Sequence, residues 1–302
     1  MLTPCLTFHP GLGGAKAVER LGVSKIWSFL SDAKAATVAT NTAIRADDGN
    51  FVDSYLTLAA RIAELQYRNR GHVLLFRGQN RDWKTLKGLT TLKPSIFRYP
   101  PGKLSLPDST LEHRYAALLE AENLLAEKWS ALAKLGRQKL VRERLLRWSI
   151  IQHYEICPTP LLDVTHSLRI AASFAGSGPG AILYVLAVPN VSGAITADAE
   201  AGLQIVRLSS VCPPAAIRPH IQEGYLLSEY PEMAGLIQKK HYSAFEMDFG
   251  RRLIAKFRFN PAAFWKDENF PPVSDQALYP KGRDWIENLT AEVAAEIKQV
   301  AA

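Results

Sequence analysis

The sequence has no run of about 18 apolar residues, the length that a membrane-spanning helix needs. Its N-terminal residues also lack the basic stretch and apolar core of a secretory signal. These absences argue against a membrane span and against export. We therefore expect a protein that works in the cytoplasm and makes no use of a membrane.

Cysteine is scarce, with 3 residues in 302, and the three positions Cys5, Cys157 and Cys212 form no CxxC pair. An odd number at wide spacing argues against a disulfide framework and a structural zinc site, so reduced thiols are expected. The histidines form no HExxH pattern either. The sequence therefore predicts no metal site.

Charge is only mildly unbalanced: 36 Lys and Arg against 29 Asp and Glu give +7, and the pI is near 9.3. With 47% hydrophobic and 22% charged residues, the chain has the composition of a globular protein. Basic residues gather in two stretches, which are either nucleic-acid-binding faces or solvated surfaces. They are Arg137, Lys139, Arg142, Arg144 and Arg147, and then Lys239, Lys240, Arg251, Arg252, Lys256 and Arg258.

Periodicity divides the chain into an N-terminal extension at 1–50 and a folded domain at 51–302. Residues 35–50 are small and polar, which indicates a loosely attached segment. Apolar spacing predicts a helix after the capping candidates Asp53 and Ser54, then a buried strand at 73–76. A long helix is expected to begin at a capping box at Ser109 and to end at Gly136.

Beyond Gly136 the spacing of the apolar residues changes along the chain. The pattern predicts a second helix at about 138–154 and a short helix at 167–175. Strands are expected at 161–164, 180–188, 203–208 and near 221–227, and an amphipathic helix at 283–300. Helices followed by a strand-rich half indicate an α+β fold with small mixed or antiparallel sheets and flanking helices.

Four segments occur in an order that resembles the FRG domain family, named for its Phe/Tyr-Arg-Gly motif. They are LLFRGQ (74–79), IIQHYEICPTPLLDVTHSLRIAASFA (150–175), IRPHIQEGYLL (217–227) and ALYPKGRDWIENL (277–289). LKPSIFR (92–98) also has the look of the family. The resemblance spans about residues 73–290, so the domain at 51–302 is identified as an FRG domain.

The order of elements is more distantly similar to that of ADP-ribosyltransferase toxins. In those proteins an arginine on one strand, a Ser-Thr-Ser motif on a second and a Gln/Glu-x-Glu motif on a later strand form an NAD site. The similarity implies an ADP-ribosyltransferase-like α+β fold with NAD, or a related nucleotide, as the ligand. Fold alone does not fix function, so this step is an analogy.

The analogy assigns roles to individual residues. Arg77 takes the place of the arginine that holds the phosphates of the dinucleotide, a task for which a permanently charged guanidinium with paired donors is suited. Asp163, Val164 and Thr165 fall where Ser-Thr-Ser would lie. Gln222 falls on the first position of Gln/Glu-x-Glu, and Gly224 stands where the catalytic glutamate is expected.

In the toxins that glutamate stabilises the oxocarbenium-like ribose as nicotinamide leaves. Glu223 is adjacent to Gly224, but neighbouring strand residues point to opposite faces unless the strand bulges. Asp163 is the alternative carboxylate. We therefore predict a catalytic set of Arg77, Asp163, Gln222 and Glu223.

A nucleotide-binding set is predicted around the same residues, formed by Arg77, Gly78, Gln79, Gln152, His153 and Thr165. The FRG pattern usually has Arg where this chain has Pro160 and Trp where it has Val164. Arg169, one helical turn into the next element, is the candidate to replace the missing arginine.

Structural interpretations stand beside these roles. Arg77 could pair with a carboxylate at a strand end, and His153 could favour the negative end of a helix dipole. Asp163 could bridge Arg77 or cap the 167–175 helix. Gln222 and Glu223 could form an exposed edge.

The resemblance favours an ADP-ribosyltransferase or an NAD glycohydrolase that acts as a toxin or anti-phage effector, with a protein or a nucleic acid as the acceptor. The alternative is a non-catalytic nucleic-acid-binding module that uses the two basic stretches.

Overall fold

The computed structural model describes residues 25–31, 33–100, 102–132, 136–176, 180–214, 216–280 and 285–300. The strands are β1 (Lys25–Ser28), β2 (Thr37–Thr40), β3 (Asn50–Phe51), β4 (Val73–Gln79), β5 (Leu162–Thr165), β6 (Ile182–Val188), β7 (Ile195–Asp198), β8 (Leu203–Arg207), β9 (Gly224–Glu229) and β10 (Leu253–Arg258). The longer helices are α3 (Tyr55–Arg68), α4 (Asp108–Ala131), α6 (Arg144–His153), α7 (Leu168–Ala175) and α13 (Trp285–Val300). Shorter ones are α2 (Asn41–Ala46), α5 (Arg137–Arg142), α8 (Leu208–Val211), α9 (Ile217–Ile221), α10 (Leu236–Lys239), α11 (Pro261–Phe264) and α12 (Asp275–Leu278), with 3-10 turns η1 (Ser95–Phe97) and η2 (Phe249–Arg252).

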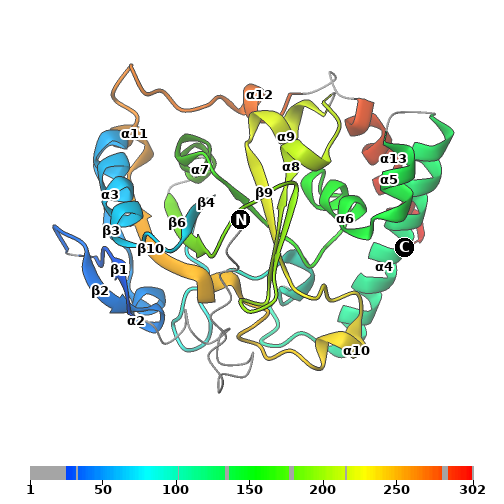
Figure 1. The fold of residues 1–302 in the computed structure, drawn as a ribbon, viewed down its shortest axis with the longest axis horizontal. Helices are drawn as coiled ribbons and strands as arrows, with labels where there is room; N and C mark the ends of the chain where they lie inside the picture. The colour runs from blue at the N-terminus through cyan, green and yellow to red at the C-terminus, as the bar shows by residue number, and fades with distance from the viewer. Residues whose placement is uncertain are drawn as a thin grey trace, which may run out of the picture.

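Within the described residues an eight-stranded sheet runs in the order β3-β10-β6-β4-β5-β9-β8-β7, beside a two-stranded sheet of β1 and β2. The β3–β10 pair is parallel and the other pairs are antiparallel. Figure 1 shows α4, α5, α6 and α13 together at one side, and α3 with β1, β2 and α2 at the other. The predicted α+β class is confirmed, but one large sheet replaces the small sheets expected. An ADP-ribosyltransferase-like form of the fold stays a prediction.

The core lies on both faces of the sheet, because alternate residues of a strand point to opposite sides. On β8 and β9 the paired residues Ile205 and Leu227 join the cluster that contains β4, β6 and β10. Their neighbours Val206 and Leu226 join the cluster under α4, α6 and α13. β6 is buried along its whole length, which agrees with the continuous apolar run that predicted it.

The helical expectations needed two corrections. No capping box forms at Ser109, because α4 begins at Asp108 and its N-cap position is Pro107, which has no side chain to donate or accept. The single helix expected at 138–154 is divided at Glu143, whose backbone is extended. Arg147 Nη1 donates to the carbonyl oxygens of Leu140 and Val141 at 2.8 and 2.7 Å, so it satisfies acceptors released by the break.

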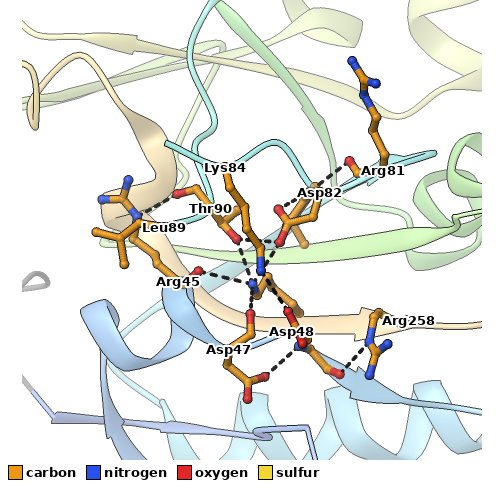
Figure 2. Close-up of polar contacts among 12 residues, drawn as sticks. Arg45, Asp47, Asp48, Arg81, Asp82, Lys84, Leu89, Thr90 and Arg258 are labelled. Atoms are coloured by element: carbon orange, nitrogen blue, oxygen red, sulfur yellow. Dashed lines mark hydrogen bonds and ion pairs between the residues drawn. The ribbon is translucent and has the colours of Figure 1, made fainter. Parts of the chain in front are cut away.

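The last strand of the sequence, β10, was missed because its basic residues look like a surface stretch. Lys256 is only 1% exposed, and burial lowers the pKa of its ammonium group. Its Nζ donates to Thr90 Oγ1 at 2.7 Å, to Asp82 Oδ2 at 3.1 Å and to the Asp47 carbonyl oxygen. Figure 2 shows Asp47, Asp82 and Thr90 converging on one point.

This cluster attaches residues 41–50 to the rest of the protein. Arg45 forms a buried ion pair with Asp248 at 2.5 Å and donates from Nε to the Thr90 carbonyl oxygen at 2.8 Å. Ile44 packs in the same hydrophobic cluster as β4 and β6. The described part of the predicted extension is therefore firmly packed rather than loosely attached, and the boundary at residue 50 stays a prediction.

Glycine is required at Gly78, where α7 crosses β4. A Cβ atom there would lie 1.8 Å from the Ala171 carbonyl oxygen and 2.7 Å from the Ala175 nitrogen. Both are backbone atoms, so a side chain could fit only if the helix moved away from the strand. The close approach at Gly78 is thus to the protein's own backbone.

We expect Gly78→Ala to lower the free energy of unfolding by about 1–3 kcal/mol, the usual cost of an overpacked core. Urea denaturation measures the change. Gly71→Ala is the matched control, since no atom lies within 4 Å of its added Cβ, and it should stay within about 0.5 kcal/mol of wild type. Equal effects of the two substitutions would show that the contact with α7 is unimportant.

Candidate functional site

A cavity of about 360 Å³ opens where β4 and β5 separate. The two strands pair at Phe76 and Thr165, and β4 then continues to Gln79 along β6 alone. The cavity is lined by Phe76, Arg77, Gly78, Gln79, Asn80, Trp83, Gln152, His153, Glu155, Asp163, Val164, Thr165, Phe174, Leu208, Arg218, Gln222, Gly224, Tyr225 and Tyr279.

Eight of the nine residues predicted for the site therefore meet in one place. β4 provides Arg77, Gly78 and Gln79, α6 provides Gln152 and His153, β5 provides Asp163 and Thr165, and Gln222 follows α9. Glu223 is the exception. Lining a cavity is not a function, so the roles assigned to these residues stay predictions.

Arg77 spans the gap between the separated strands. Its Nη1 donates to the carbonyl oxygen of Asp163 at 2.6 Å, where the next rung of a β ladder would have been. With the amide oxygen of Gln79 facing it, Gln79 accepts from Arg77 Nε and Nη2 at 3.1 and 3.2 Å. Burial lowers the pKa of Arg77, but a guanidinium remains charged in proteins. These bonds use three of the five donors that a guanidinium offers.

The carboxylate of Asp163 is held inside the cavity by an amide. Gln152 Nε2 donates to Asp163 Oδ2 at 2.5 Å, and Gln152 Oε1 accepts in turn from the Thr159 hydroxyl. Burial raises the pKa of Asp163, while the charge of Arg77 and the Gln152 bond act to lower it. Asp163 neither caps α7 nor forms a direct ion pair with Arg77 in the described structure. Both structural interpretations of this residue are therefore wrong.

His153 is a neutral group in the cavity wall. It is 4% exposed, and burial followed by the positive charge of Arg218 lowers its pKa to about 3. An uncharged imidazole gains little from a helix dipole, so that interpretation does not hold. Its Nε2 is buried without a hydrogen-bond partner, which is costly for a polar atom.

Gln222 and Thr165 connect the segments that line the cavity through hydrogen bonds. The strand expected at 221–227 begins only at Gly224, and Gln222 is the C-cap residue of α9 instead. Its Nε2 donates to the Leu278 carbonyl oxygen at 2.8 Å. The hydroxyl of Thr165 donates to the Gln222 carbonyl oxygen at 2.8 Å. Both polar side chains thus already have protein partners, and Gln222 is 7% exposed rather than part of an exposed edge.

Glu223 lies outside the cavity, which corrects its predicted catalytic place. It is exposed and adopts a positive φ of 45° in the turn between α9 and β9, so its side chain leaves the sheet before the strand starts. Gly224 does line the cavity, but a Cβ there would lie 2.7 Å from Leu208 Cδ1. The neighbouring side chain therefore occupies the place where a larger residue at 224 would begin.

Several lining residues were not predicted. Arg218 brings a second guanidinium, 4.7 Å from the centre of the Tyr279 ring, and pairs with Glu155 at 3.1 Å. Arg169, the expected substitute for a missing arginine, instead donates to the Pro271 carbonyl oxygen at 2.8 Å and does not line the cavity. Arg218 and Tyr279 lie within segments that carried the family resemblance, but nothing in the sequence placed them beside Arg77.

A third guanidinium lies within electrostatic reach. Desolvation and then the positive charge of Arg77 lower the pKa of Arg98, whose Nε donates to the Lys93 carbonyl oxygen at 3.0 Å. Like-charged groups repel one another, so two guanidinium groups in the cavity wall and a third near Arg77 are favourable only near negative charge. Asp163 and Glu155 supply part of that charge, and an anionic ligand would supply more.

The two predicted basic stretches divide between the interior and the surface. Glu122, 3% exposed, accepts from Arg144 and Arg147 at 3.2 and 3.0 Å and from Trp148 Nε1 at 2.6 Å. Arg251 is fully buried and pairs with Glu229 at 2.6 Å. Arg252 and Lys256 are 3% and 1% exposed. Arg251, Arg252 and Lys256 therefore stabilise the interior, whereas Arg137, Lys139, Arg142, Arg144, Lys240 and Arg258 are exposed. The alternative of a nucleic-acid-binding face stays a prediction.

Other chemistry finds little support among the described residues. No group of three His, Cys, Asp or Glu is placed to hold a metal ion. Burial raises the pKa of the Cys157 thiol to about 12, so it stays protonated and unreactive, whereas Cys5 lies outside the described residues. None of the helices described is long and apolar enough to cross a bilayer.

Comparison with known proteins gives one match. Residues 72–181 match the family model described as the FRG domain. This range contains β4, α6, β5 and α7, and hence most of the cavity wall. No curated protein and no solved structure matches the chain.

We expect Asp163→Asn to raise the thermal midpoint at neutral pH. Asparagine keeps an acceptor for Gln152 and removes a charge whose folded-state pKa is raised by burial. The raised pKa of Asp163 costs the folded state stability only at a pH where the carboxyl group would otherwise be ionised. The difference in thermal midpoint between Asp163→Asn and wild type should therefore shrink as pH falls below the raised pKa. Thermal melts of both proteins across pH test this. An Asp163→Asn variant that is less stable than wild type at neutral pH would show that the charge of Asp163 does not destabilise the folded protein.

Proposed function

This chain carries an FRG domain, and we propose that the cavity between β4 and β5 binds NAD or a related nucleotide. We further propose that the protein is an ADP-ribosyltransferase or an NAD glycohydrolase. One observation carries the proposal: Arg77, Asp163 and Gln222, which lie far apart in the sequence, line a single cavity together with Arg218. The guanidinium and the amide come from positions that the analogy compares, and the carboxylate of Asp163 is the candidate to replace the glutamate that is absent at Gly224.

Two features of the cavity suit a dinucleotide. Arg77 and Arg218 present charge and paired donors for phosphate oxygens. Aromatic rings from Trp83, Phe174, Tyr225 and Tyr279 line the same space and offer stacking surfaces for heterocyclic rings.

The chain's residues divide the reaction between them. Arg77 and Arg218 hold the phosphates and fix the ribose, and Asp163 faces the developing positive charge as the nicotinamide–ribose bond breaks. Nicotinamide leaves with the bonding electron pair. A water molecule or a nucleophile of the acceptor then bonds to the ribose carbon and releases a proton to solvent. Asp163 takes the electrostatic role that Gly224 cannot perform.

We expect the protein to release nicotinamide from NAD, and Arg77→Ala to weaken this reaction by roughly ten- to 150-fold, as for loss of about 1.5–3 kcal/mol of charge-assisted hydrogen bonding. Chromatography of free nicotinamide measures the rate. Arg77→Lys keeps the positive charge but lacks the paired donors of a guanidinium, so its rate should fall between those of wild type and Arg77→Ala.

The matched control is Arg169→Ala, which removes a guanidinium outside the cavity and should leave the rate unchanged. Thermal shift with NAD reports binding apart from turnover, because a ligand of the folded state stabilises it. Absence of both release and thermal shift in the wild-type protein would overturn the proposal.

An enzyme that consumes NAD or modifies a macromolecule in the cytoplasm would be harmful when unrestrained, so we also propose a toxin or anti-phage effector role. Induced expression in bacteria should arrest growth, and Arg77→Ala should restore it. Arrest by wild type and Arg77→Ala alike would separate toxicity from the cavity and contradict this role.

A further inference from the structure

One segment beside the cavity has a strong local excess of positive charge. Residues 81–107, here called the basic tract, contain six basic residues and one acidic residue, a balance of +5 out of +7 for the whole chain. The basic residues are Arg81, Lys84, Lys87, Lys93, Arg98 and Lys103, and the acid is Asp82. Neither basic stretch predicted from the sequence includes any of them.

The single acid of the basic tract faces inward. Asp82 accepts from Lys256 Nζ at 3.1 Å and from Tyr184 OH at 3.0 Å, and its side chain is 15% exposed. Figure 2 shows Arg81 extending away from the cluster that Asp82 joins. The acid is thus neutralised internally, while Arg81, Lys87, Arg98 and Lys103 are exposed. Lys84 pairs with Asp48 at 2.8 Å, so the surface charge of the tract comes mainly from these four cations.

Two large aromatic side chains of the basic tract are also exposed. Trp83 is 50% exposed and Tyr99 is 46% exposed. Each lies against a cation of the tract: Arg81 is 3.3 Å from the centre of the Trp83 ring, and Lys93 Nζ is 4.2 Å from that of Tyr99. Trp83 also lines the cavity, so this surface leads to its mouth.

We propose that the basic tract binds single-stranded nucleic acid, whose unpaired bases stack on Trp83 and Tyr99 while the exposed cations neutralise phosphates. Interleaved aromatic rings and cations fit a single strand, because in a duplex the faces of the bases are already stacked on neighbouring base pairs. An acidic peptide would satisfy the charges but not the two rings. Delivery of an acceptor nucleotide to the cavity rests on the proposed function, whereas binding of the strand does not.

Fluorescence anisotropy with labelled oligothymidylate, oligouridylate and a DNA duplex tests the proposal on the full chain. We expect both single strands to bind more tightly than the duplex, with affinity that falls steeply as salt rises. The two single strands distinguish DNA from RNA as the source. Binding to neither, or equal binding of the duplex, would overturn the proposal.

Charge is tested by neutralising two exposed lysines of the basic tract. Lys87→Gln with Lys103→Gln should lower the slope of log affinity against log salt by about 1.4, since each phosphate contact contributes about 0.7 for single strands. The matched control, Arg142→Gln with Lys240→Gln, removes two exposed charges elsewhere and should leave the slope unchanged. Equal loss in the two variants would contradict a localised site.

Stacking is tested away from the cavity. Tyr99→Leu should weaken single-strand binding about fivefold or more, the loss expected for one base–aromatic stack. Tyr67→Leu is the control, because Tyr67 is 63% exposed and also lies against an arginine, Arg70 at 4.2 Å. Equal effects would contradict stacking on Tyr99. Thermal shift with NAD, measured on the same samples, shows whether the proposed nucleotide site holds or fails independently.

Discussion

The bond from Arg77 Nη1 to the carbonyl oxygen of Asp163 is the contact on which the candidate site depends. Two neighbouring strands of a sheet normally share a continuous ladder, and leaving buried backbone groups unpaired is costly. Here β4 and β5 separate after Phe76 and Thr165, and the guanidinium satisfies an acceptor that the ladder would have used. One side chain thus holds the opening and contributes charge to the space it creates.

The surrounding residues follow from that opening. Gln152 secures the carboxylate of Asp163 from α6, and Thr165 fixes the turn that carries Gln222. Gly78 lets α7 cover the far side of β4. Segments separated by more than a hundred residues therefore share one wall, and the FRG family match covers most of it.

Much of this arrangement could be predicted from the sequence. The apolar runs of β4 and β6 and the spacing of α3 and α13 predicted their elements, because burial imposes those periods. The family motifs predicted that Arg77, Asp163 and Gln222 lie in one site, and all three line the same cavity. Arg218 and Tyr279 escaped because their position depends on how α9 and the segment before α13 fold over the sheet.

The positions of the basic residues in the sequence were a less reliable indication of what lies on the surface. Arg251 and Lys256 were counted as surface residues, yet Glu229 and Asp82 pair with them in the interior. A list of basic positions cannot distinguish a buried ion pair from a solvated face, since the partner lies far away in the sequence. Within the described residues, exposed cations remain in both predicted stretches, and Arg81, Lys87, Arg98 and Lys103 add a further group in the segment that carries Trp83.

The contact between Gly224 and Leu208 also limits which residues fit at position 224. A Cβ atom there would lie 2.7 Å from Leu208 Cδ1. That atom ends a side chain, so a larger residue at 224 fits only if Leu208 turns away, and Leu208 is packed in the cluster under α4, α6 and α13. A substitution in the cavity wall would therefore be transmitted to the packing of these helices, which couples the shape of the cavity to the core behind it.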